Sequence, residues 1–253
     1  MKHILARRNL DVLAQYTRTN VLLAFDYDGT LSPIVRDPAK ARMRARTRRA
    51  LAQVAERYPA AVISGRARDD VASYVEGIRL VEILGNHGVE PSPKMARYAR
   101  AVREWAQVLR RELRDVPGVT VEDKTYSLAV HYRRSPARRD AAQEIRRSIE
   151  GLREECRVIG GKCVLNLLPA GAPHKGQALE RLRDEQNADT VIFAGDDVTD
   201  EDVFGLERSG KLLGIRVGRT SKRIPRYYLR NQSEVDAFLI HLAELRAASS
   251  STA

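Results

Sequence analysis

Apolar runs of four or five residues alternate with helical spacing in the first third of the chain. Runs such as Val21–Phe25 and Ala60–Ile63 are short and uninterrupted, which is typical of strands buried on both faces. We expect strands over 21–25, 60–63 and 81–84, and helices over 45–57 and 68–75. Strands that alternate with helices through short loops predict a parallel sheet with helices on its faces.

A different pattern begins at the breaker cluster Pro91-Ser92-Pro93 and lasts to Pro169-Ala170-Gly171-Ala172-Pro173. Between them we expect a helix, a hairpin, a helix and two strands, over 94–114, 119–122, 127–132, 136–155, 157–159 and 162–168. Alternation then returns, with helices over 175–185, 200–207 and 234–245 and strands over 190–194 and 212–217. The chain is therefore predicted to be an α/β protein. Its parallel-sheet domain would span 1–89 and 172–253, with an α+β domain inserted over 90–171.

Size and composition are those of a soluble globular protein, with 253 residues, 43% hydrophobic and 30% charged. No apolar run approaches the roughly 20 residues needed to cross a bilayer, and the N-terminus lacks the apolar stretch of a signal peptide. Two cysteines are too few for a disulfide framework. We expect a cytoplasmic monomer with no membrane partner.

A net charge of +11 raises the question of nucleic-acid binding. Arginine is spread along the helix-like segments and mixed with acidic residues, without interleaved aromatic residues or a known nucleic-acid-binding motif. We expect no nucleic-acid partner. A basic surface also gathers small phosphorylated anions, which fits the chemistry that follows.

Polar residues follow four of the predicted strands, where an open parallel sheet binds its ligands. These segments are Asp26-Tyr27-Asp28-Gly29-Thr30, Ser64-Gly65-Arg66, Gly85-Asn86-His87-Gly88 and Gly195-Asp196-Asp197-Val198-Thr199-Asp200. Side chains alternate along a strand, so Asp26 and Asp28 point the same way. Two such acids repel each other unless a cation lies between them or one is protonated. A fifth segment, His174-Lys175-Gly176, opens a predicted helix.

Together these residue types suit phosphoryl transfer, although each alone has a plainer explanation as a turn, a cap or a solvated residue. A carboxylate such as Asp26 can be phosphorylated, which divides hydrolysis into two easier steps. Mg²⁺ prefers carboxylate, carbonyl and water ligands, and Asp26 and Asp196 can supply part of that set. Ser64 and Lys175 can bind the phosphate. Asp28 can protonate the leaving alcohol and later deprotonate the attacking water.

With these pieces placed, the chain resembles the haloacid dehalogenase (HAD-like) superfamily of phosphatases, and within it the trehalose-6-phosphate phosphatase family. The resemblance rests on the motifs within residues 25–34, 63–66, 84–90, 127–133, 195–202 and 234–239. It implies a Rossmann-type parallel-sheet core and a mobile inserted cap. It also implies a Mg²⁺-dependent hydrolase of trehalose biosynthesis whose partner is a small sugar phosphate.

The resemblance also assigns roles. Asp26 corresponds to the nucleophile, Asp28 to the acid/base, and Ser64 and Lys175 to the phosphate-binding pair. Metal ligands correspond to Asp26, the backbone carbonyl of Asp28 and Asp196, with Asp197 and Asp200 acting around the ion or through water. The expected substrate contacts are Asp26, Tyr27, Asp28, Arg66, Asn86, Lys124, His131, Arg133, Lys162 and Asn166.

One segment departs from the family pattern. Where the family shows a glutamate and an arginine before a proline, this chain has Asn166 and Leu168 before Pro169. The family's glutamate faces sugar hydroxyls, and asparagine can bind a hydroxyl only without charge assistance. Trehalose 6-phosphate remains the expected substrate. The alternatives are another sugar phosphate or glycosyl phosphate, and a non-catalytic regulatory or nucleic-acid-binding protein.

Overall fold

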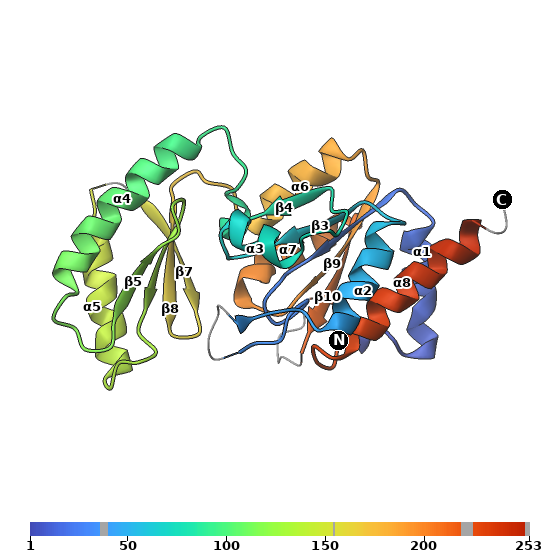
Figure 1. Cartoon of the computed structure of the whole chain (residues 1–253), viewed down its shortest axis with the longest axis horizontal. Helices are drawn as coiled ribbons and strands as arrows, with labels where there is room; N and C mark the ends of the chain where they lie inside the picture. Colours follow the sequence, from blue (N-terminus) through green and yellow to red (C-terminus); the bar gives the residue numbers. More distant parts are fainter. Residues whose placement is uncertain (36–39, 154, 219–224, 251–253) are drawn as a thin grey trace. The chain divides into compact units, whose positions relative to one another are not determined.

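The computed structural model describes residues 1–35, 40–153, 155–218 and 225–250. Met1–Gly88 and the chain from His174 onward form one compact unit, here called the core unit (Figure 1). Val89–Pro173 form a second, the insert unit. The assignment of these units as a catalytic core and a substrate cap stays a prediction.

The core unit is built on a seven-stranded sheet in the order β1-β11-β10-β9-β2-β3-β4. Every pairing in this sheet is parallel, which confirms the predicted α/β class with a parallel-sheet core. The strands are β1 Lys2–His3, β2 Val21–Phe25, β3 Ala60–Ile63, β4 Glu82–Leu84, β9 Thr190–Gly195, β10 Leu212–Val217 and β11 Tyr227–Leu229.

Strand β2 lies inside the sheet, between β9 and β3, and its five residues are fully buried. Val21, Leu23 and Phe25 pack into one core layer, and Leu22 and Ala24 into the other. An uninterrupted apolar run is therefore required, because both faces of the strand are covered.

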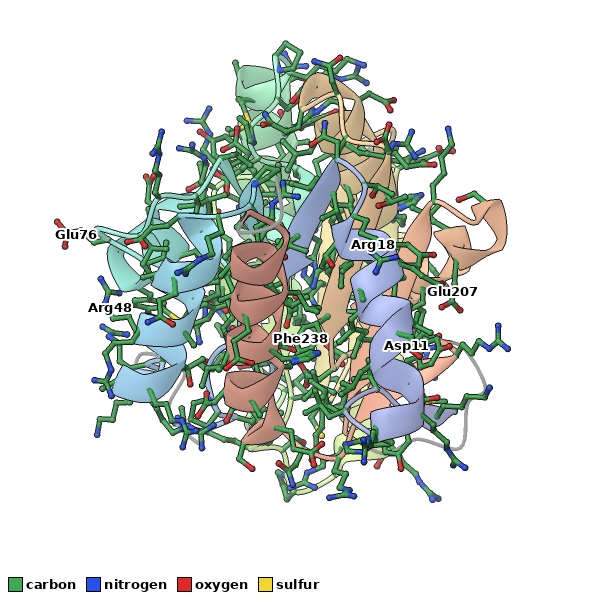
Figure 2. The ribbon with its side chains drawn as sticks, turned by 90° about the vertical axis from the view of Figure 1, so that its right-hand side faces the viewer. Asp11, Arg18, Arg48, Glu76, Glu207 and Phe238 are labelled. Atoms are coloured by element: carbon green, nitrogen blue, oxygen red, sulfur yellow. The ribbon has the colours of Figure 1, made fainter. Side chains whose placement is uncertain are left out.

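Helices cover both faces of this sheet. Figure 2 shows α2, α8 and α1 side by side on one face, with Phe238 of α8 in the adjoining core layer. Helices α6 and α7 pack on the opposite layer. The helices are α1 Leu10–Thr17, α2 Ala45–Ala55, α3 Arg68–Tyr74, α6 Lys175–Glu185, α7 Glu201–Phe204 and α8 Glu234–Ser250, with 3-10 turns at Arg7–Asn9, Asn86–Gly88, Val198–Asp200 and Gly205–Ser209.

Some core elements escape the sequence pattern. Strands β1 and β11 contain only two and three residues, too few for an alternation to be recognised. The helix expected over 200–207 is reduced to the single turn of α7 between two 3-10 turns. The turn before α7 is fixed by a hydrogen bond from the Asp197 backbone amide to Asp200 Oδ2 (2.9 Å).

The insert unit is a four-stranded antiparallel sheet in the order β5-β6-β8-β7. Its strands are β5 Thr120–Asp123, β6 Leu128–His131, β7 Cys156–Gly161 and β8 Val164–Pro169, and its helices are α4 Met95–Glu112 and α5 Arg138–Glu150. Both helices pack on one face, where Trp105 and Ile145 meet Leu128 and Leu167. None of the helices in the described ranges is both long and apolar enough to span a membrane.

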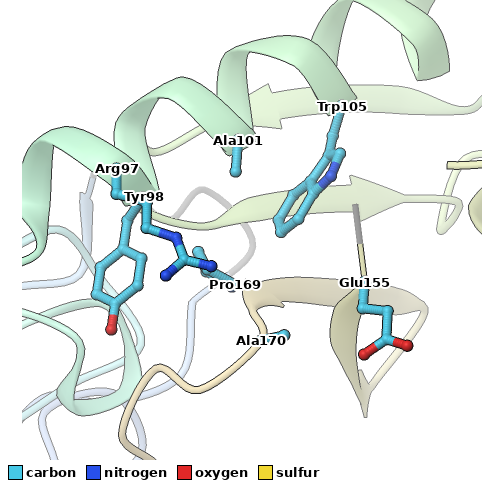
Figure 3. A pocket seen from close by; sticks show the side chains of 7 residues that line it. All are labelled: Arg97, Tyr98, Ala101, Trp105, Glu155, Pro169 and Ala170. Carbon is cyan, nitrogen blue, oxygen red and sulfur yellow. The ribbon is translucent and has the colours of Figure 1, made fainter. Parts of the chain in front are cut away.

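A hollow of about 290 Å³ lies beside α4 within the insert unit (Figure 3). Its lining residues are Arg97, Tyr98, Ala101, Trp105, Glu155, Pro169 and Ala170. None of them is a predicted site residue. The hollow therefore adds nothing to the strand-end chemistry of the core unit, which is described next.

Candidate active site

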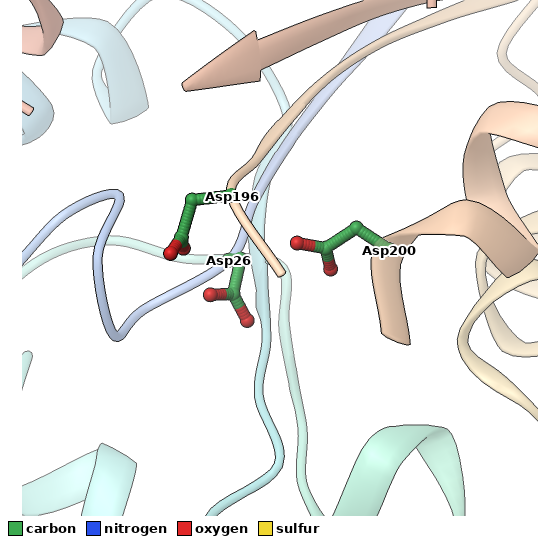
Figure 4. Close-up of side chains that lie close together, drawn as sticks. All are labelled: Asp26, Asp196 and Asp200. Atoms are coloured by element: carbon green, nitrogen blue, oxygen red, sulfur yellow. The ribbon is translucent and has the colours of Figure 1, made fainter. Parts of the chain in front are cut away.

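Three carboxylates meet at the carboxyl ends of the two central strands (Figure 4). Asp26 follows β2, Asp196 follows β9, and Asp200 lies in the turn after β9. One carboxylate oxygen from each lies within 4.8 Å of the others. The β2–β9 pairing fixes this meeting, because the Asp26 backbone amide still donates to the Ala194 carbonyl (2.9 Å).

Lys175 is the cation of this cluster. Its Nζ lies 2.7 Å from Asp26 Oδ1 and 2.7 Å from Asp200 Oδ1, and the side chain is 2% exposed. A buried ammonium without such partners would be strongly disfavoured. Two of its three donors are used, so one N–H remains for a ligand.

The start of α6 places Lys175 there. His174 caps the helix, since its Nδ1 accepts from the backbone amides of Gly176 (3.1 Å) and Gln177 (3.3 Å), and Gln177 Oε1 accepts from the His174 amide. Gly176 lies so close to the carbonyl of Asp202 that a Cβ would overlap it. In this segment, His174 caps the helix, Lys175 supplies the positive charge, and Gly176 allows the close approach to Asp202.

Burial perturbs all three charged partners. It raises the pKa of Asp26 well above its usual range; Lys175 opposes this shift, and the charges of Asp200 and Asp196 add to it. Burial, with the charges of Asp200 and Asp197, raises the pKa of Asp196 to about 7. Burial alone would lower the pKa of Lys175, but the two carboxylates raise it above its usual value. The cluster therefore holds more negative charge than Lys175 balances.

This donor set fits a hard divalent cation. Oxygen ligands in excess of the neutralising lysine are what Mg²⁺ or Ca²⁺ requires. The adjoining turn is shaped to match, because Gly29 has φ +83° and any Cβ there would overlap the Asp196 carboxylate. Thr30 Oγ1 donates to Asp196 Oδ1 (3.2 Å) and orients it. Asp26, Asp196 and Asp200 are the residues that could hold the ion.

Two further predicted metal residues have their carboxylates elsewhere. The side chain of Asp197 is exposed; it acts on the cluster through its charge, and its backbone amide donates to Asp200. The carboxylate of Asp28 pairs with Arg66, through Nε to Oδ2 (2.6 Å) and Nη2 to Oδ1 (2.7 Å). The family resemblance assigns the metal to the backbone carbonyl of Asp28, and that role stays a prediction.

Loops at the ends of β3 and β4 form the next part of the site. Ser64 is 1% exposed, and its Oγ accepts from the Arg66 amide (3.2 Å). The His87 amide donates to the Ser64 carbonyl (2.8 Å), and the Asn86 amide to the Arg66 carbonyl (2.7 Å). Asn86 and His87 both have positive φ, 47° and 60°, which is uncommon outside glycine and concentrates at functional sites. Gly65 has room for no side chain, since a Cβ would overlap the His87 ring.

Two of the expected substrate contacts, Tyr27 and Asn86, have no exposed surface at all. Tyr27 is fully buried in the same core layer as Phe25, and its hydroxyl donates to the Ala41 carbonyl (3.3 Å). Burial raises the pKa of Tyr27 to about 12, with the charge of Asp28 adding to the shift. Asn86 is also fully buried. The strand alternation that turns Asp26 toward the site turns Tyr27 away from it.

The expected sugar contacts of the insert unit are spread over its sheet. Strand register places His131 and Asn166 on the face that carries no helix. Lys124 lies in the β5–β6 turn and Lys162 in the β7–β8 turn, at opposite ends of the sheet. Arg133 lies at the Lys162 end and donates to its carbonyl (3.2 Å). Of these five residues, His131 and Asn166 share one face of the sheet, where His131 is partly exposed and Asn166 is buried, with 8% of its surface exposed.

Sequence reasoning missed two residues that support these groups. Glu122 Oε2 lies 2.7 Å from His131 Nε2, and only the β5–β6 register brings them together. Arg216 of β10 donates to Glu201 Oε1 (3.0 Å) and to the Asp197 carbonyl (3.2 Å), which stabilises the turn carrying Asp200. A single arginine in an apolar strand is the one signal that the second residue gives.

Comparisons with known proteins show the family to which the chain is related. The sequence model of the family described as trehalose-phosphatase matches residues 24–229. A probable trehalose-phosphate phosphatase 4 of Oryza sativa subsp. japonica is 34% identical over 99% of this chain and 74% of its own length. A trehalose-phosphate phosphatase of Mycolicibacterium paratuberculosis is 39% identical over 76% of this chain and 53% of its own.

Solved structures have a similar fold. A trehalose-6-phosphate phosphatase of Aspergillus fumigatus superimposes with a TM-score of 0.66 at 28% identity, covering 98% of this chain and 100% of its own. The C-terminal domain of the Candida albicans trehalose-6-phosphate phosphatase gives a TM-score of 0.79 at 23% identity, covering 94% and 98%. The second likeness concerns the fold alone.

We predict that Asp196→Asn stabilises the protein in EDTA and removes its stabilisation by Mg²⁺. The pKa of Asp196 is raised in the folded state, so its carboxylate costs stability as the pH rises from the unfolded value of 3.8 toward about 7. At pH 8 the gain should be about 1–2 kcal/mol, or a few degrees in thermal unfolding. Asparagine keeps an oxygen for the Thr30 hydroxyl. A variant less stable than the parent in EDTA, with an intact Mg²⁺ shift, would contradict the assignment.

A second prediction concerns the glycine beside Asp196. Gly29→Ala should destabilise the protein and weaken the Mg²⁺-dependent shift in thermal unfolding, because the new Cβ needs the space of the Asp196 carboxylate. Gly210→Ala is the matched control: its φ is +74°, and nothing lies within 4 Å of the position that its new Cβ would take. The control should lose only about 1 kcal/mol for its backbone conformation and keep the full Mg²⁺ shift. Equal behaviour of the two variants would show that the close approach of Gly29 to the Asp196 carboxylate does not matter for Mg²⁺ binding.

Proposed function

The chain belongs to the trehalose-phosphatase family, and we propose that it hydrolyses trehalose 6-phosphate to trehalose and phosphate through an aspartyl-phosphate on Asp26, with Mg²⁺ as cofactor. The observation that carries this proposal is the buried cluster of Asp26, Lys175, Asp196 and Asp200 at the ends of β2 and β9. A cluster of opposite charges of this kind, in a protein of this family, is an arrangement for binding and transferring a phosphoryl group.

In the first step Asp26 attacks phosphorus. Its Oδ1 is held by Lys175, so Oδ2 is the oxygen left to attack. A bond forms between that oxygen and phosphorus as the bond from phosphorus to the sugar oxygen breaks. Asp28 gives its proton to the departing sugar oxygen, and Ser64 and the remaining N–H of Lys175 bind phosphate oxygens.

In the second step water attacks the phosphorus of the aspartyl-phosphate. Asp28, now a carboxylate, accepts a proton from that water, so one residue serves as acid and then as base. The bond between phosphorus and Asp26 breaks, inorganic phosphate is released, and the carboxylate of Asp26 is regenerated. A Mg²⁺ ion held by Asp26, Asp196 and Asp200 would supply positive charge against the transferred phosphoryl oxygens.

The insert unit supplies groups suited to a sugar. On the helix-free face of its sheet, Glu122 and His131 form a hydrogen-bonded pair, and Asn166 lies on the neighbouring strand β8. Carboxylate, imidazole and amide groups are hydroxyl-binding side chains. We include this surface in the proposal as the part that selects the leaving group.

Two alternatives to trehalose 6-phosphate hydrolysis are each supported by one observation. Another sugar phosphate or glycosyl phosphate is favoured by Asn166 and Leu168, which replace the family's glutamate and arginine. A regulatory role has a structural counterpart, because the C-terminal domain of a Candida albicans trehalose synthase regulatory protein has this fold, at 11% identity and a TM-score of 0.70. The buried Asp26–Lys175 pair with its two further acids favours catalysis over regulation.

Asp26→Asn should reduce phosphate release from trehalose 6-phosphate by at least about 10³-fold, because the nucleophile is lost while its shape is kept. Asp11→Asn, an exposed residue of α1, is the matched control and should keep full activity. Thermal unfolding checks that both variants fold. Undiminished turnover by Asp26→Asn would show that the nucleophile lies elsewhere.

A panel of phosphorylated sugars separates the substrate alternatives. We expect the highest kcat/KM for trehalose 6-phosphate, compared with glucose 6-phosphate, sucrose 6-phosphate and glucose 1-phosphate, with released phosphate as the readout. Asn166→Glu should raise that value about tenfold, since a charged acceptor strengthens a hydroxyl contact. Turnover of p-nitrophenyl phosphate, which has no sugar, should stay constant. A different best substrate that Asn166→Glu does not affect would favour the alternative.

A further inference from the structure

Arg66 and Asp28 form a two-pronged ion pair at the end of the sheet. Nε and Nη2 of the guanidinium face the two oxygens of the carboxylate at 2.6 and 2.7 Å. This side-on arrangement fixes both the position and the plane of the carboxylate, which a single contact would not do. The arginine side chain is 13% exposed and the aspartate side chain 40%, so the cation is the anchored member.

The guanidinium is anchored by aromatic residues of the core unit. It lies over the rings of Tyr74, at 5.3 Å, and Tyr27, at 5.9 Å, and its Nη1 is 3.4 Å from the Tyr74 hydroxyl. The two rings lie against each other with centroids 5.3 Å apart. Such contacts favour a planar cation and restrict where it can move.

The backbone of Arg66 is held as well. Its amide donates to Ser64 Oγ (3.2 Å), and its carbonyl accepts from the Asn86 amide (2.7 Å). Arg66 thereby connects the turn after β2, the turn after β3 and the turn after β4. By contrast, Asp28 sits in the turn that follows β2, and among the described residues Arg66 is the partner that the structure gives its carboxylate.

From this geometry we propose that Arg66 is a positioning residue for proton transfer: it holds the Asp28 carboxylate in place and does not itself bind the substrate phosphate. This inference rests on the proposed function, in which Asp28 is the acid and base. The carboxylate has about four lone-pair sites and Arg66 occupies two, so each oxygen keeps one for the sugar oxygen or the water. The Nε–Nη2 edge of the guanidinium is already occupied by Asp28, so a phosphate could bind that edge side-on only by displacing these two charge-assisted hydrogen bonds.

A double-mutant cycle tests the proposal. Arg66→Met should lower kcat for trehalose 6-phosphate about 10²-fold, within the range that positioned acid/base groups contribute, with KM changed less than about threefold. Arg66→Lys should recover little of this loss, because an ammonium cannot form the fork. Arg68→Gln is the matched control. It removes a nearby arginine whose partner is Glu82 (3.0 Å), and it should keep the parent kcat.

The cycle itself distinguishes positioning from binding. If Arg66 acts through Asp28, the double variant Arg66→Met with Asp28→Asn is no slower than Asp28→Asn alone. A further loss of tenfold or more in the double variant, together with weaker inhibition by inorganic phosphate, would overturn the proposal and make Arg66 a phosphate ligand. Thermal unfolding of Arg66→Lys, which keeps the charge, controls for loss of fold.

The same variants distinguish failure of the proposed function from failure of the positioning role. Undiminished turnover by Asp28→Asn would remove the acid/base assignment itself, whatever Arg66→Met does. If Asp28→Asn is inactive and Arg66→Met keeps the parent kcat, the reaction stands and the positioning role is wrong.

Discussion

The buried ammonium of Lys175 between Asp26 and Asp200 is the interaction on which the site depends. Each contact is 2.7 Å long, and all three side chains are almost fully withdrawn from water. Two carboxylates so placed would repel each other without this cation, and the cation would be unstable without them. The capped start of α6 and the side-chain-free Gly176 allow the lysine to enter. The core unit is therefore assembled around a charge arrangement that is still short of positive charge.

A similar pairing recurs around the site. Arg66 forms an ion pair with Asp28. Arg216 forms one with Glu201 and also donates a hydrogen bond to the turn before it. In each case the cation comes from a different strand or turn than the acid, so the ion pair fixes two segments relative to each other. Part of the basic character of the chain is thus used in ordering its acidic residues.

The two strands that carry the site could be predicted from the sequence, because β2 and β9 are uninterrupted apolar runs followed directly by acidic residues. The order of Asp26, Ser64, Lys175 and Asp196 along the chain likewise predicts residues at the ends of β2, β3 and β9 and at the start of α6. Local sequence patterns do not predict which side chains pair when they are far apart in the sequence. The partnership of Arg66 with Asp28, and that of Glu122 with His131, depend on tertiary contacts and strand register. The burial of Tyr27 follows from alternation, although its place inside an acidic motif obscured that.

The pairing of β2 with β9, here called the central seam of the core sheet, has a consequence for how the protein folds during synthesis. Strands β2, β3 and β4 are neighbours, as are β9, β10 and β11, and the two groups meet where β2 pairs with β9. The whole insert unit leaves the ribosome between them. The nascent chain therefore carries a buried-type strand with one unsatisfied edge until β9 emerges, a state exposed to aggregation. Asp26 and Asp196 stand on opposite sides of that seam, so the site comes into existence only when the seam closes.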